Sequence, residues 1–162
     1  VKLDHNGHRT RVNLRGYRML GTRNPALDLD TDFVYVADQD NNRVVVLHKD
    51  GTLKKEIPLP RPVQVSADGH GNAWVSASEQ AERQHPMQLV KFSADGKMLV
   101  RRTNLTAYGM AATTGGCWIA CSQLYFVDNG GETTLLGQPT CGPSSWAFDE
   151  NHRAEKVFYC PR

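Results

Sequence analysis

Short apolar runs alternate with polar turns along the whole chain, and the three-to-four-residue spacing of a buried helix face is absent. The clearest case is the pair of strand-like runs at residues 44–47 and 52–57, which flank Asp50-Gly51. An Asp-Gly pair between two strands predicts a tight hairpin in which both turn residues take positive φ.

This hairpin pattern recurs at a regular distance. The other turn glycines are Gly7, Gly96 and Gly130, so successive turns lie 34 to 45 residues apart. A second pair of short strands precedes three of the hairpins, within residues 24–38, 61–78 and 107–122. A four-stranded unit that repeats with this period is typical of a β-propeller blade.

We therefore predict an all-β fold with one β-propeller domain spanning residues 1–162. The predicted complete blades cover residues 20–58, 61–103 and 106–138. Residues 141–162 resemble the first half of a blade and residues 1–16 the second half, so the N-terminal hairpin is expected to complete a fourth blade. The alternative is that such halves pair between chains, so that blades are shared in a larger propeller. A fragment of a longer propeller is less favoured, because a random cut would rarely leave complementary halves.

One stretch carries a family pattern. Residues 38–51, DQDNNRVVVLHKDG, place Asp and Asn before an Arg, an apolar strand and a glycine turn. This order resembles the NHL repeat, and the chain is similar to the NHL-like and lactonase-like propellers. That resemblance implies the fold, but members of the group bind proteins, RNA, sugars or small molecules, and a few are lyases or lactonases. Function must therefore be argued from a site.

Composition narrows the class of partner. A net charge of +2 gives little reason to expect nucleic acid, and no apolar run reaches the roughly 20 residues of a membrane helix. Val1 is interpreted as a mature N-terminus or an artificial boundary, because neither an initiator Met nor a signal-like start is present.

The cysteines indicate a compartment. Their even number, 4, favours an extracellular or periplasmic protein with disulfides, and free buried thiols in the cytosol are the alternative. Cys121 and Cys160 hold equivalent positions in adjacent blades, and Cys141 lies in the crossing between them, within reach of both. The favoured disulfide is Cys141–Cys160, which would fasten the closing blade.

In a propeller, the links that enter the innermost strands and the connections between second and third strands gather on one face, here called the loop face. The insertion at residues 79–87 overhangs it, and long loops on a rigid scaffold often carry recognition. The alternative is that these loop residues only bind neighbouring backbone. The predicted ligand-binding residues on this face are Arg23, Asn24, Asp38, Arg61, Gln64, Glu79, His85, Tyr108, Ser144 and Ser145.

The sequence gives little support for a catalytic or metal-binding site. No three histidines are expected to converge, and Asp28, Asp30 and Asp32 lack the Gly and Glu of a calcium loop; Asp32 is expected to cap a turn. We expect no metal and no cofactor. The favoured function is a binding or scaffold module for a small molecule or protein, with a propeller lyase or lactonase and a structural assembly protein as alternatives.

The outermost strands differ in charge. Lys54-Lys55 and Arg101-Arg102 lie on two of them, where charge opposes edge-to-edge pairing. The third carries the uncharged residues Thr133, Thr134, Leu135 and Leu136. This edge is predicted to be covered, by a second chain in a homo-oligomer or by the N-terminus.

Overall fold

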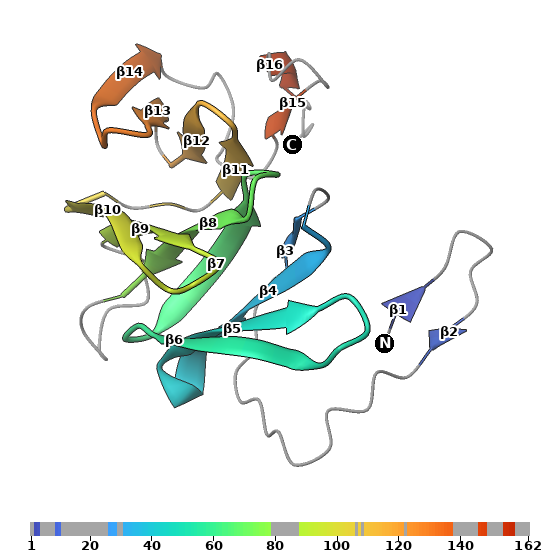
Figure 1. Ribbon diagram of the computed structural model, residues 1–162. Coiled ribbons are helices and arrows are strands. Elements are labelled where there is room, and N and C mark those ends of the chain that lie inside the picture. Colours follow the sequence, from blue (N-terminus) through green and yellow to red (C-terminus); the bar gives the residue numbers. More distant parts are fainter. Residues whose placement is uncertain are drawn as a thin grey trace.

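The structure is a computed structural model that describes residues 2–3, 9–10, 26–28, 31–78, 88–105, 107, 109–121, 123–137, 146–148 and 154–157. Apart from one short 3₁₀ turn, η1 (Gln39–Asn41), the elements of this part of the chain are strands (Figure 1). Short β-branched and aromatic runs separated by polar turns explain this all-β result.

Three antiparallel sheets of four strands follow one another along the chain. The first contains β3 (Ala26–Asp28), β4 (Phe33–Asp38), β5 (Arg43–His48) and β6 (Leu53–Pro58). The second contains β7 (Pro62–Ala67), β8 (Asn72–Ala77), β9 (Gln88–Ser93) and β10 (Met98–Thr103). The third contains β11 (Gly109–Thr113), β12 (Gly116–Ala120), β13 (Leu124–Asp128) and β14 (Thr133–Gly137). In each sheet, strands adjacent in sequence are hydrogen-bonded neighbours.

The remaining strands form two separate pairs. β1 (Lys2–Leu3) pairs with β2 (Arg9–Thr10), and β15 (Trp146–Phe148) pairs with β16 (Ala154–Val157). Figure 1 shows the two pairs apart from each other, so the described strands form no closed ring of sheets. The N-terminal pair does not cover β14 either, because β14 is the free edge of its sheet.

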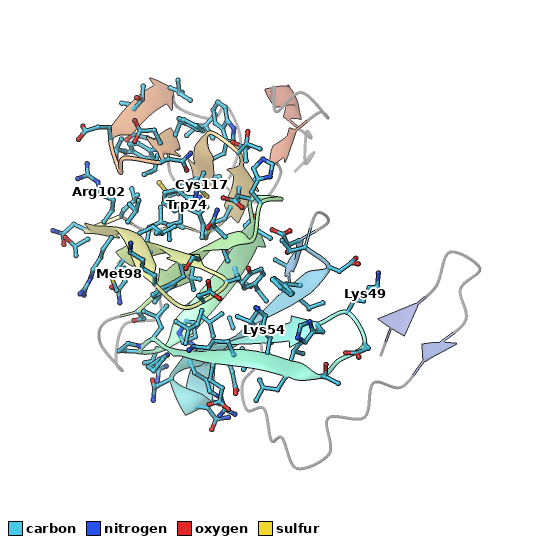
Figure 2. The ribbon with its side chains drawn as sticks, viewed as in Figure 1. Lys49, Lys54, Trp74, Met98, Arg102 and Cys117 are labelled. Carbon is cyan, nitrogen blue, oxygen red and sulfur yellow. The ribbon has the colours of Figure 1, made fainter. Side chains whose placement is uncertain are left out.

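The sheets pack face to face through two apolar cores. β7 contacts both β3 and β11, so the first strands of successive sheets are neighbours. Tyr35 and Val44 of the first sheet share a core with Val75 of the second. Trp74 lies on the other face of the second sheet and packs in a core with Cys117 of the third (Figure 2). The alternating side chains of β8 therefore fill both cores, as expected for a strand buried on two faces.

The three hairpins between third and fourth strands share one turn geometry. The Gly51 amide donates to the carbonyl three residues earlier at 2.8 Å, and Gly51 has a φ of 91°. Gly96 and Gly131 repeat this arrangement with φ values of 82° and 88°. Asp50 has no positive φ, so the prediction of two left-handed residues per turn is wrong. In each turn the last residue is a left-handed glycine. In the third hairpin this residue is Gly131 and not the predicted Gly130.

A polar joint connects the first two sheets. The fully buried Asp28 accepts a hydrogen bond from the Gly71 amide at 2.9 Å, and the Tyr35 hydroxyl donates to the Gly71 carbonyl at 3.0 Å. Asp28 also accepts from the Thr31 amide at 3.0 Å. The carboxylate that caps this turn is thus Asp28, whereas Asp32 forms an ion pair with Lys49. Burial, followed by the nearby carboxylates, raises the pKa of Tyr35.

A different joint connects the second and third sheets. The buried Lys91 ammonium lies 2.9 Å from the Asp68 carboxylate, donates to the Asn129 side chain at 2.7 Å and lies 5.4 Å from the centre of the Trp74 ring. Burial acts to raise the pKa of Asp68, but hydrogen bonds from Lys91 and Asn72 hold it below its usual value. A buried charge is stable here because it is paired and hydrogen-bonded.

In the described residues, no helix is long and apolar enough to cross a membrane.

Candidate functional site

The loop face of the first sheet is built around Asp38. This residue is fully buried, and both of its carboxylate oxygens accept hydrogen bonds from the Asn41 amide, at 3.1 and 2.9 Å. Arg43 donates to the same carboxylate at 2.8 Å and also pairs with Glu56 at 3.0 Å. The Asp, Asn and Arg of the NHL-like stretch therefore fix the β4–β5 connection. The expectation that Asp38 also contacts a ligand stays a prediction.

Asn42 joins this connection to the second sheet. It has a φ of 54°, a left-handed conformation that Asn tolerates better than most residues. Its backbone carbonyl accepts a hydrogen bond from the Leu59 amide at 3.0 Å, and its side-chain oxygen accepts one from the Arg61 amide at 3.0 Å. The Ser78 amide donates to the Arg61 carbonyl at 3.1 Å. Three parts of the loop face meet at Arg61: the β4–β5 connection, the β6–β7 link and the end of β8.

Arg61 itself has an unusual environment. Its φ is 43°, and the surrounding backbone hydrogen bonds hold it in this sparsely populated conformation. The side chain is half-buried, and its Nε is buried without an acceptor in the described part of the chain. A buried N–H without a partner is costly, so such a group usually binds water or a ligand. Among the predicted charged site residues that the structure describes, Asp38 and Arg61 both lie at this end of the molecule.

Further buried polar atoms lie in the second sheet, among them one on Ser76 and one on Gln88. Ser76 Oγ and Gln88 Oε1 have no hydrogen-bond partner among the described residues, although Ser76 is 0% and Gln88 2% exposed. Ser76 lies opposite the predicted site residue Gln64 in the sheet register, and Gln88 lies opposite Ala77. Gln88 begins β9 directly after the insertion. Sequence reasoning missed Ser76 and Gln88, although a Ser inside the apolar run of β8 was a usable signal.

The rest of the predicted site falls on residues that the structure does not describe. These are Arg23, Asn24, Glu79, His85, Tyr108, Ser144 and Ser145, together with the predicted disulfide partners Cys141 and Cys160. Among the described residues, no three His, Cys, Asp or Glu side chains are grouped as a metal site. His48 is exposed at the end of β5 and packs edge-on against Phe33, with 5.5 Å between ring centres. Cys117 and Cys121 are buried free thiols.

Solved structures resemble this arrangement. The likeness to "Streptogramin B lyase structure" has a TM-score of 0.65 at 17% identity, and covers 85% of this chain and 47% of that one. The likeness to the nidogen/laminin complex has a TM-score of 0.62 at 17% identity, with 82% and 54% covered. Both contain β-propellers. The fold is of the β-propeller type.

A third likeness is more distant in sequence. Kuenenia stuttgartiensis hydrazine synthase gives a TM-score of 0.61 at 10% identity, with 81% of this chain and 40% of that chain covered. This chain therefore spans about half, or less, of each of these three chains. No protein-family model matches the sequence, and no curated protein matches it either. At these identities the likeness establishes the fold and leaves the activity open.

Proposed function

We propose that this propeller-type chain is a non-enzymatic binding module that recognises an anionic group of a small molecule or protein partner through its loop face, with Arg61 as the central contact. The observation that carries the proposal is the buried Arg61 Nε, which lacks an acceptor among the described residues while the backbone around it is fixed. A guanidinium with a free N–H is well suited to carboxylates and phosphates, which it binds through charge-assisted hydrogen bonds.

The preorganised position of Arg61 supports binding over a purely structural role. Asn42 and Ser78 hold the Arg61 backbone from two sides, so little conformational freedom remains to be lost when a ligand binds. The predicted neighbours Arg23, Glu79 and His85 would add polar contacts around it. Ligand specificity on this proposal comes from the loops, and the three sheets act as the rigid support.

Citrate and inorganic phosphate are suitable probes, added separately at constant ionic strength. A ligand that binds only the native state raises the unfolding midpoint. We expect at least one probe to raise the midpoint of the unaltered protein and of Lys97→Gln, and neither to raise that of Arg61→Gln. Lys97 is a matched control, because it is exposed in the β9–β10 turn at the opposite end of the sheet. Equal effects on all three proteins, or no effect on any, would contradict the proposal.

We also propose that β1–β2 and β15–β16 combine into one four-stranded blade, closing an NHL-like propeller of four blades. Support comes from strand number, because each described sheet has four strands and each remaining pair has two. Pairing would protect from hydrogen exchange the backbone amides of β16 that do not bond β15. Removal of residues 1–16 should abolish that protection, whereas unchanged exchange would contradict closure. Loss of protection on dilution would indicate blades shared between chains.

An extracellular or periplasmic location and the Cys141–Cys160 disulfide form a linked proposal. It rests on the even number of cysteines, 4, and on the burial of Cys117 and Cys121 as free thiols. A thiol count on the denatured, unreduced protein should find two reactive thiols, since the other two are joined. Four reactive thiols would contradict it.

A further inference from the structure

The three outer strands present different edges to solvent. β6 carries Lys54, Lys55 and Glu56, and β10 carries Arg101 and Arg102. Charged side chains on an edge strand oppose pairing with a second sheet, because like charges would be brought together and desolvated. These two strands are therefore poor surfaces for edge-to-edge assembly.

β14 lacks this protection. Its sequence, TTLLG, contains no charge, and all five residues are exposed. Leu135 and Leu136 are 54% and 49% exposed. β14 pairs with β13 on one side only, and Figure 1 shows it at the outer edge of the third sheet. Since no described strand pairs with its outer side, the backbone N–H and C=O groups there are available to another strand.

We propose that β14 pairs antiparallel with β14 of a second copy of this chain, about a two-fold axis at Leu135. A two-fold contact uses the same patch on both copies, so an edge must be compatible with itself. Among the described outer strands, β14 alone meets this condition, because β6 and β10 would each place like charges near one another. The partner that fits this edge best is therefore β14 of a second copy.

The two-fold axis defines a register. With Leu135 opposite its own copy, Thr134 lies opposite Leu136 and Thr133 opposite Gly137 in the partner strand. Both exposed leucines then gain cross-strand apolar contacts, and the outward backbone groups gain hydrogen bonds. The two third sheets become one continuous sheet of eight strands. The interface does not involve Arg61, so its failure would leave the proposed ligand site unaffected.

Light scattering or sedimentation equilibrium over a range of concentrations tests this pairing. The unaltered protein should approach twice 18.0 kDa at high concentration and dissociate on dilution. Leu135→Lys should remain a single chain throughout, because the axis would bring two ammonium groups together. Leu99→Lys is the control, since Leu99 is 45% exposed on β10 and the substitution is the same; it should dimerise like the unaltered protein.

Two results would overturn the proposal. One is a single-chain mass for the unaltered protein at every concentration. The other is an equal mass for the Leu135→Lys and Leu99→Lys variants, which would also be the outcome if the chains shared blades instead. Hydrogen exchange adds a second readout: the amides of β14 that do not bond β13 should be protected in concentrated protein and exposed in Leu135→Lys.

Discussion

Tyr35 of the first sheet donates its hydroxyl hydrogen bond to the backbone carbonyl of Gly71 in the second, at 3.0 Å, although the two residues are 36 positions apart. Tyr35 is fully buried, so this bond forms away from water. Asp28 binds the amide of the same glycine. One turn of the second sheet is therefore held by both of its polar backbone groups, which fixes how the two sheets pack.

Tyr35→Phe should weaken this joint. The substitution keeps the ring but removes one of the two donors to the Gly71 carbonyl, which still accepts a hydrogen bond from the Ala94 amide at 2.8 Å. The free energy of unfolding should therefore fall by about 0.5–1.5 kcal/mol. Urea denaturation measures this change. Tyr125→Phe is a control, because the Tyr125 hydroxyl donates to Gln123 within one sheet and is only partly buried. An equal loss in both variants would contradict a special role for the joint.

The same residue predicts a response to alkali. The folded pKa of Tyr35 is raised, so above about pH 10 the unfolded chain loses this proton while the native protein keeps it. The contribution of Tyr35 to stability is therefore fully present below pH 10 and is lost as the pH rises further. Urea denaturation at pH 9 and pH 11 should show a smaller alkaline loss in Tyr35→Phe than in the unaltered protein. A larger loss in the variant would contradict this assignment.

The Lys91–Asp68 joint predicts a response to acid. The folded pKa of Asp68 is lowered, so its contribution is present above the unfolded value near 4 and is lost as the pH falls through the folded value. Lys91→Met should cost about 3–5 kcal/mol at neutral pH, because it leaves a buried carboxylate unpaired.

Two comparisons test this reading of Lys91. The Lys91→Met variant should lose less stability than the unaltered protein between pH 5 and pH 2, since burial without the ammonium raises the pKa of Asp68. Adding Asp68→Asn to Lys91→Met should recover part of the loss at neutral pH. Identical acid profiles would show that Lys91 does not control Asp68.

Gly116 should tolerate no side chain. A Cβ there would overlap the Val127 carbonyl oxygen and lie 2.9 Å from the Cα of Asp128, and backbone atoms cannot rotate away. Gly116→Ala should therefore cost about 3 kcal/mol in chemical denaturation. The neighbouring Gly115→Ala is the control, because the nearest atom to its Cβ would be the Thr113 hydroxyl oxygen at 3.8 Å. Similar losses in the two variants would argue against the close approach of β12 and β13.

The Asn42 side chain is expected to position Arg61 on the loop face. Asn42→Gly keeps the left-handed conformation but removes the side-chain hydrogen bond to the Arg61 amide. Whichever of citrate and phosphate binds should bind about fivefold more weakly, equivalent to about 1 kcal/mol, because Arg61 is less firmly positioned. Calorimetric titration measures the change. An unchanged affinity would mean that the Asn42 side chain does not position the site.

The repeat length predicted the three four-stranded sheets because each strand pairs with its neighbour in sequence. Each turn between them also carries its own signal in Asp, Asn or Gly. The turn geometry was wrong because an Asp-Gly pair fits two hairpin types, and only the backbone shows that the final glycine alone is left-handed. The joints could not be predicted, since Tyr35 and Gly71 meet only after two sheets have packed. At the candidate site, loop position led to the prediction of Arg61 as a ligand contact, which stays a prediction. The free Nε of Arg61 and the buried Ser76 and Gln88 depend on packing that the sequence does not record.

The most direct test of the binding proposal is NMR observation of the arginine Nε–H groups during titration with citrate and with phosphate. The account predicts that the Arg61 Nε–H resonance shifts saturably with at least one of these anions, and that the resonance of Arg101, exposed on β10, stays in place. An Arg61 resonance unmoved by either anion, or one that moves no more than that of Arg101, would contradict the central claim.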